Sequence, residues 1–435
     1  MNGRVGNALL FILTFFFVFP PIIKTSYFEV PIPLILSSLL SVLFLSGIVK
    51  GGGVGRYVAY PFFSLVIVAL YFLMVSAFVG FQDLIMVKSL VYFILFLFGS
   101  CYLVYLYQSN YGPNLKYLLF MFYVGVVHSV IMVLVFISYE SREFLYSYVV
   151  LTEVGQNFLS YGIRSPGLTS GGGAALSVIQ AMLLICGLQY VVLCWKTLSN
   201  GKLVFLMALM LIVFISIALS GRTGFVVLFL WVVYSLLFKF IAFPSKSIIN
   251  LISFMKRRFV SILIVAAVFS VSIIYVDFSK YEAAISMAFE MYFNYSETGK
   301  FESRSTSHIV NEMVIFPSSE MQFMFGDGNF GRSSSLDYLP TDIGYIRIIF
   351  GSGVVGILVL SLILFVMVVC ACLYGVIFPI RAVFLFSILV MFLVNFKELF
   401  FVTTQGWPQV MCLLYFSLFN LVAGRKVSNE FGVVK

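Results

Sequence analysis

The stretch Leu203–Ser220, LVFLMALMLIVFISIALS, carries no charged side chain. Its length approaches the roughly 20 helical residues needed to cross the hydrocarbon core of a bilayer. Similar apolar runs recur throughout the 435 residues, of which 62% are hydrophobic and only 10% are charged. Water could not cover that much apolar surface in a soluble domain. The sequence therefore predicts an all-α, polytopic integral membrane protein.

Hydropathy predicts about twelve transmembrane helices in this chain. The runs are Ala8–Ile23, Ile32–Val49, Tyr57–Gly80, Leu84–Tyr107, Leu115–Tyr139, Gly173–Trp195, Leu203–Ser220, Gly224–Phe243, Phe259–Val276, Gly344–Val376, Phe378–Phe396 and Trp407–Ala423.

The distribution of lysine and arginine predicts how these helices are oriented. If the amino terminus is cytoplasmic, the short inside connections hold most of the basic residues, among them the cluster Lys256-Arg257-Arg258. The opposite orientation would break the tendency of positive charge to stay inside. Both termini are therefore predicted to be cytoplasmic. The net charge of +9 is mainly a topology signal, so it gives no reason to expect nucleic-acid binding.

The same orientation predicts where chemistry could take place. It puts two long loops, residues 140–172 and 277–342, on the outer side of a single transmembrane domain that covers residues 1–435. The other connections are short enough to be simple turns. Any active site is thus expected in the two outer loops and at the helix ends beside them.

Four arginines in these outer regions are candidates for binding an anion. A charged group near the hydrocarbon is costly, and the arginine guanidinium presents a fixed fork of donors that matches phosphate oxygens. Each side chain could instead reach the lipid headgroups. The four are Arg164, Arg222, Arg304 and Arg347.

Two of the arginines lie next to glycine-rich segments. Arg222 is in the turn Ser220-Gly221-Arg222-Thr223-Gly224 between two apolar runs, and Arg164 precedes Gly171-Gly172-Gly173 at a helix start. A glycine-rich helix start exposes backbone amides that can bind an anion. The alternative is that these glycines belong to flexible loops.

A general base is expected among the polar residues of the later outer loop. Asp342 opens the tenth run, could accept a proton from a sugar hydroxyl, and could equally be a helix N-cap. Tyr345 could position an acceptor or support Asp342. His308 follows Arg304 at helical spacing and is the alternate base, unless this is only a solvated helix face. His128, inside an apolar run, is interpreted as a core residue.

Two patterns do not support cofactor or metal chemistry. Gly351-x-Gly353-x-x-Gly356 matches the dinucleotide pattern, but it lies in an apolar run without a preceding strand, so close helix packing explains it better. Cys370-x-Cys372 has the wrong spacing for a zinc site. We therefore predict no cofactor and no metal.

Three segments resemble the bacterial O-antigen polymerase family (Wzy) and, more distantly, the O-antigen ligases. They are SGRTG at 220–224, Arg164-Ser-Pro-Gly before a glycine-rich helix start, and FGDGNFG followed by TDIGYIRIIFGSGVVG within 325–356. Their order and predicted sidedness over the full chain are similar to that family. Ligases typically carry His-Asn where this chain has Asp342-Ile343, so the resemblance favours a polymerase.

The resemblance implies a membrane glycosyltransferase of the metal-independent C-type architecture in the bacterial inner membrane, active at the periplasmic face. Donor and acceptor would be undecaprenyl-pyrophosphate-linked glycans, surrounded by membrane lipids. The existing chain would be transferred onto the incoming repeat unit with inversion at the anomeric carbon. The chain could also bind a polysaccharide chain-length regulator. Whether the product is an O-antigen or a capsule polysaccharide stays open.

Other functions remain open at this point. A ligase-type transferase would use the same chemistry on a different acceptor. A flippase for lipid-linked oligosaccharides, or another transporter, would also fit twelve spans with both termini inside. A transporter usually shows repeat symmetry between its halves and polar residues at mid-membrane, and neither is obvious in this sequence.

Overall fold

The computed structural model is mostly helical and confirms an all-α membrane protein. It describes residues 3–25, 28–49, 55–81, 83–160, 162, 164–195, 197–242, 282, 286, 290–299, 304–330, 339–401 and 406–422. Its strands are short: β1 (Ile22–Lys24) pairs with β2 (Glu29–Pro31), and an isolated antiparallel bridge joins Ile23 to Val149. The sequence did not predict this hairpin.

Contacts between residues divide the chain into two compact units. The first unit consists of Met1–Pro20, Pro31–Pro113 and Glu290–Val427, and the second of Pro21–Val30, Asn114–Phe289 and Ser428–Lys435. Each unit is described by itself below. The single transmembrane domain expected from the sequence stays a prediction.

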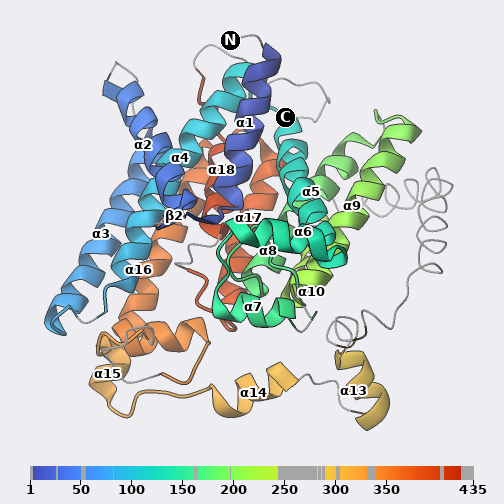
Figure 1. Ribbon diagram of the computed structural model, residues 1–435. Coiled ribbons are helices and arrows are strands. Elements are labelled where there is room, and N and C mark those ends of the chain that lie inside the picture. Colours follow the sequence, from blue (N-terminus) through green and yellow to red (C-terminus); the bar gives the residue numbers. More distant parts are fainter. Residues whose placement is uncertain are drawn as a thin grey trace. The chain divides into compact units, whose positions relative to one another are not determined.

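The described helices of the first unit come from both ends of the chain. In Figure 1, α3 and α16 lie side by side with α15 packed at one end of α16. The helices are α1 (Gly3–Val18), α2 (Ile32–Val49), α3 (Arg56–Phe78), α4 (Ile85–Tyr111), α13 (Glu290–Thr298), α14 (Arg304–Glu312), α15 (Glu320–Phe325), α16 (Gly344–Tyr374), α17 (Phe378–Val394) and α18 (Trp407–Phe416).

The second unit is built around α8, whose residues are buried on nearly every side. It packs against α5, α9 and α10, because small residues such as Ala174, Ala175 and Gly187 let neighbouring helices approach. The described helices are α5 (Lys116–Ile137), α6 (Tyr139–Tyr148), α7 (Glu153–Ser160), α8 (Ala174–Cys194), α9 (Asn200–Ser220) and α10 (Thr223–Ala242).

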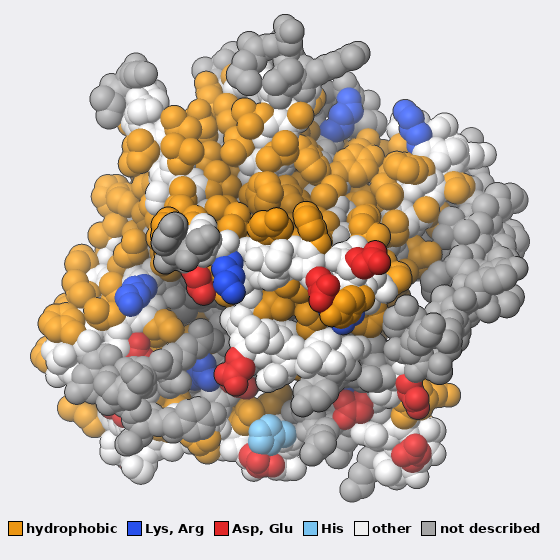
Figure 2. Space-filling view, viewed as in Figure 1, with side chains coloured by type: hydrophobic (Ala, Val, Ile, Leu, Met, Phe, Trp, Pro, Cys, Tyr) orange, Lys and Arg blue, Asp and Glu red, His pale blue; other side chains and the backbone are white. Residues whose placement is uncertain are grey.

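Several helices are suited to a lipid environment. In the described part of the chain, six are long and apolar enough to cross a membrane: α3, α4, α5, α8, α9 and α16. Four shorter apolar helices are Gly6–Val18, Ile32–Ile48, Thr223–Leu237 and Phe378–Val394. Large apolar side chains such as Phe63, Phe229 and Leu358 are exposed, and Figure 2 shows hydrophobic side chains over much of the visible surface. Lipid tails would cover such surfaces at little cost.

The helices follow most of the predicted spans. Ile32–Val49 has the predicted bounds, and the helices at the other described spans begin or end within a few residues of them, although α18 stops at Phe416. The predicted span Phe259–Val276 lies outside the described residues. The two predicted loops are not simple coils, since α6 and α7 form in the first and α13, α14 and α15 in the second.

The long helix α16 is broken at Gly353, where φ is 69°. This left-handed conformation is open to glycine and disfavoured for other residues. Donors from other segments satisfy the carbonyls around the break: Asp327 N–H donates to Phe350 O (2.7 Å), Gly328 N–H to Gly351 O (3.0 Å) and the Tyr71 hydroxyl to Ser352 O (3.0 Å).

The glycines of α16 make room for the segment that supplies two of those donors. A Cβ at Gly353 would overlap the backbone at Met324, and one at Gly351 would overlap the ring of Phe330. The glycine pattern therefore serves close packing, as the sequence predicts. The packed partner is α15 with residues 326–330.

Candidate functional site

Arg164 lies in the second unit, immediately after α7. Its Cζ is 4.3 Å from the centre of the Phe158 ring, a cation–π contact that fixes the guanidinium. Its Nη1 lies 3.9 Å from the position that a Cβ would take at Gly173. Arg164 thus lies between Phe158 of α7 and Gly173 at the start of α8.

The start of α8 offers backbone amides to an anion. Gly173 is the N-cap with φ of 87°, and within the described residues no side chain caps this end. The first amides of an α-helix have no partner inside the helix, and the helix dipole makes this end positive. A guanidinium beside such an end is a favourable arrangement for binding phosphate oxygens.

The turn containing Arg222 lies against the same end of α8. A Cβ at Gly221 would be 3.5 Å from the carbonyl carbon of Gly173, and Gly224 N–H donates to Ser177 Oγ (3.1 Å). At Gly224 a Cβ would lie 2.6 Å from Ser177 O, so both glycines of SGRTG allow this close approach. Arg222 itself is partly exposed.

A backbone hydrogen bond ties the two arginine segments together. Ser165 N–H donates to Leu219 O (2.9 Å), which joins the residue after Arg164 to the end of α9. Arg164 and the turn that contains Arg222 therefore both border Gly173, although they are distant in sequence. We call Arg164, Gly173 and Arg222 the arginine cluster.

His128 holds the segment that leads into this cluster. It is fully buried, as expected of a core residue, and its Nε2 accepts from Leu168 N–H (3.3 Å). Its Nδ1 is 2.7 Å from the Gln180 side-chain amide. The Gln180 side-chain oxygen accepts from Ser129 Oγ (3.3 Å), so the amide beside His128 is held from both ends. A positioning role for His128 could not be predicted from the sequence, because Leu168 is 40 residues away along the chain.

In the first unit, Arg347 is engaged by its own chain. The residue is only 8% exposed, its Nε donates to Thr341 O (2.7 Å) and its Nη2 donates to Asp342 Oδ1 (3.0 Å). The Asp342 side chain remains 64% exposed. This ion pair holds the residues that precede α16 against its first turn.

Asp342 does not cap α16, and Tyr345 does not contact Asp342 through its hydroxyl. Ile343 is the N-cap of α16 and no side chain caps that end, so Asp342 is not the cap. The reason is that its carboxylate turns to Arg347. The Tyr345 hydroxyl donates to Phe392 O (2.8 Å), so it supports the end of α17 instead of Asp342.

His308 and Arg304 lie together on α14 of the first unit. His308 Nδ1 is 2.9 Å from Glu312, one helical turn further on, and both side chains are largely exposed. This agrees with the predicted helical spacing and with a solvated helix face. The side chain of Arg304 lies outside the described residues. The candidates thus form one group in the second unit, and two groups, on α14 and at α16, in the first.

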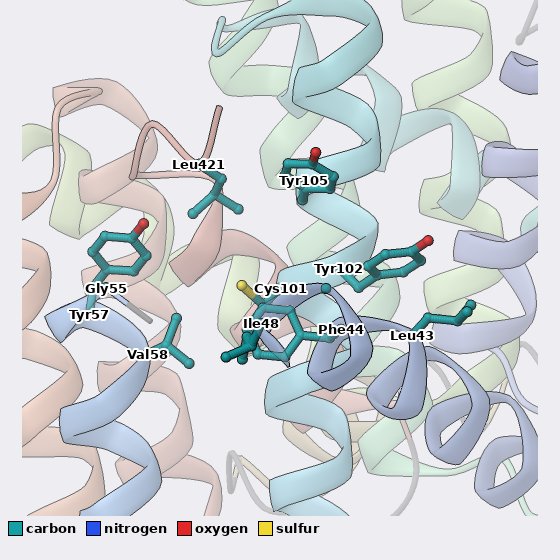
Figure 3. A pocket seen from close by; sticks show the side chains of 11 residues that line it. Leu43, Phe44, Ile48, Gly55, Tyr57, Val58, Cys101, Tyr102, Tyr105 and Leu421 are labelled. Atoms are coloured by element: carbon teal, nitrogen blue, oxygen red, sulfur yellow. The ribbon is translucent and has the colours of Figure 1, made fainter. Parts of the chain in front are cut away.

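A cavity of about 230 Å³ in the first unit contains none of these candidates. Figure 3 shows the rings of Tyr57, Tyr102 and Tyr105 around it, together with the thiol of Cys101 and several aliphatic side chains. None of the described residues that line it is charged.

The described residues contain no group of three or more His, Cys, Asp or Glu that could hold a metal ion. All six cysteines are free, and only Cys372 is exposed.

Comparisons of the chain with protein-family models, curated proteins and solved structures found no match.

Proposed function

We propose that the chain is an O-antigen polymerase of the bacterial inner membrane. It would join undecaprenyl-pyrophosphate-linked repeat units at the periplasmic face, with about twelve spans and both termini cytoplasmic. The observation that carries the proposal is the arginine cluster, in which Arg164 and the turn of Arg222 meet the uncapped start of α8. Two guanidiniums and a positive helix end suit a diphosphate group.

The chemistry needs such an arrangement. An acceptor hydroxyl oxygen would form a bond to the anomeric carbon of the donor sugar, while the bond from that carbon to the diphosphate oxygen breaks. The proton of the hydroxyl would pass to a general base, and the lipid diphosphate would leave with added negative charge. Fixed donors aimed at that charge lower the barrier. No step in this scheme draws on a nucleotide sugar.

The general base is proposed to be Asp342, with His308 as the alternate. Asp342→Asn is a clean test, because asparagine keeps an oxygen for the hydrogen bond from Arg347 and removes only the charge. If Asp342 is the base, turnover falls about 100-fold or more while the protein stays folded. Unchanged turnover would move the assignment to His308→Gln.

The test of the function itself uses the purified full-length chain in lipid vesicles. Lipid-pyrophosphate-linked repeat units are added without nucleotide sugar, and the products are separated by size. Longer lipid-linked chains are expected. A ligase-type transferase would instead move the glycan onto a lipid A core acceptor, and a flippase would change the side of the membrane on which unextended repeats are found. Either result without elongation would refute the polymerase.

A further inference from the structure

The second unit contains a cavity of about 540 Å³ that is lined in part by α7, the helix that precedes Arg164. This volume is in the range of roughly 300–1,000 Å³ typical of small-molecule sites. Aliphatic residues form part of its lining. Its polar lining residues are Lys24, Glu29, Arg142, Tyr146, Gln156 and Ser160.

Hydrogen bonds to main-chain carbonyls fix the walls of this cavity. Val150 N–H donates to Ile22 O (2.8 Å), so the β1–β2 hairpin is bound to the connection between α6 and α7. Arg142 donates to Val135 O and Phe136 O at the end of α5, which anchors α6. The lining residues therefore belong to segments held in one arrangement.

Several polar groups in the cavity are available to a ligand. In the described part of the chain, neither the Lys24 ammonium nor the Glu29 carboxylate makes an ion pair. The Gln156 amide donates to Leu151 O (3.3 Å), which leaves its oxygen as an acceptor. The Ser160 hydroxyl donates to Asn157 O and keeps its lone pairs. Donors and acceptors in such a mixture match the hydroxyl groups of a sugar.

Helix α7 connects the cavity to the arginine cluster. Helix α7 lines the cavity through Gln156 and Ser160, and the same helix supplies Phe158, on which Arg164 is stacked. Tyr146 donates its hydroxyl proton to Gly167 O (3.2 Å), in the segment that leads from Arg164 to α8. Burial raises the pKa of the Tyr146 hydroxyl, so it remains a donor at neutral pH.

We infer that this cavity binds the sugars next to the diphosphate of the lipid-linked donor. The assignment rests on the proposed function, because a diphosphate at the arginine cluster would bring its attached sugar to the neighbouring cavity. Glu29, Gln156 and Lys24 would then accept from and donate to its hydroxyl groups, and the glycan would be recognised independently of its lipid.

The experiment separates glycan binding from diphosphate binding in the full-length chain. One probe is the unlinked oligosaccharide released by mild acid from the lipid-linked repeats of the organism that encodes the chain, and the other is undecaprenyl diphosphate without sugar. Glu29→Ala/Gln156→Ala should weaken oligosaccharide binding about 10-fold and leave undecaprenyl diphosphate binding unchanged. Arg164→Ala should do the reverse.

Glu153→Ala is the matched control, since Glu153 is an exposed glutamate on α7 that does not line the cavity. Lys24→Met serves as the decisive variant if the double exchange fails to fold. Wild-type affinity for the oligosaccharide in Glu29→Ala/Gln156→Ala, or in Lys24→Met where the double variant does not fold, would overturn the inference. No oligosaccharide binding by the wild type would do the same. Weakened oligosaccharide binding in a chain that does not elongate repeats would support the cavity and refute the polymerase.

Discussion

Arg164 and Arg347 lie near the starts of α8 and α16, yet their surroundings differ. Arg347 is buried, and a carbonyl and a carboxylate of its own segment accept from it. Arg164 is half-buried, stacks on Phe158 and reaches the uncapped glycine end of α8. The same residue type thus contacts its own segment in one unit and lies beside a candidate anion site in the other. Charge and sidedness alone could not separate these roles.

The largest expected effect is the loss of polymer in Arg164→Ala and Arg222→Ala. Each exchange removes a cation proposed to stabilise the departing diphosphate, so elongation should fall about 100-fold or more. Polymer length is measured on gels, and single-repeat surface product should persist because ligation would not need this site.

The corresponding lysine variants sharpen this comparison. Arg164→Lys keeps the charge and loses the planar fork, so partial activity is expected. Wild-type ladders from both alanine variants would break the assignment of the arginine cluster.

Arg347→Ala should act on stability instead. It leaves Thr341 O without its donor and breaks the ion pair with Asp342. The free energy of unfolding should fall by roughly 3 kcal/mol, at the low end for a buried pair because Asp342 is exposed. Thermal unfolding in detergent measures the loss, and affinity for undecaprenyl diphosphate should be retained in the folded fraction. A large loss of that affinity without a change in unfolding would show that Arg347 is also a ligand.

His128→Leu should loosen the segment between Arg164 and α8. Leu168 N–H and the Gln180 amide would lose a buried partner, which costs about 2 kcal/mol. His128→Gln restores an acceptor near the Nε2 position and should recover much of the stability and elongation. If leucine and glutamine variants behave alike, His128 is a packing residue only.

The last effect, on stability alone, is expected at the break in α16. Gly353→Ala forces an alanine into a left-handed conformation and against the Met324 backbone, which costs at least about 1–2 kcal/mol. Gly47→Ala is the control in the same unit, because nothing lies within 4 Å of its Cβ position. Equal thermal unfolding of the two variants would argue against the break.

The apolar spans could be predicted from the sequence because their signal is local. The sequence predicts α2 with its observed bounds, Ile32–Val49. A run of apolar residues is enough to define a helix in lipid, without reference to its neighbours. The break in α16 at Gly353 could not be predicted from the sequence. It depends on amides of Asp327 and Gly328 and on the Tyr71 hydroxyl, the last of which is 281 positions away.

The candidate site was predictable only in part for the same reason. The glycines around Arg164 and Arg222 indicated tight turns, and both turns do meet α8. The pairing of Asp342 with Arg347 was not foreseen, because an aspartate before a helix is usually a cap. The cavity beside α7 was missed entirely, since its walls come from a hairpin that has no strong strand pattern.

Direct binding of a diphosphate tests the central claim. Undecaprenyl diphosphate without sugar is titrated into the purified wild type, the Arg164→Ala/Arg222→Ala variant and Arg347→Ala in the same detergent. We predict that the double variant binds at least about 10-fold more weakly than the other two, and that the difference shrinks as salt is added. Equal affinity for all three proteins would contradict the proposal that the arginine cluster holds the leaving group.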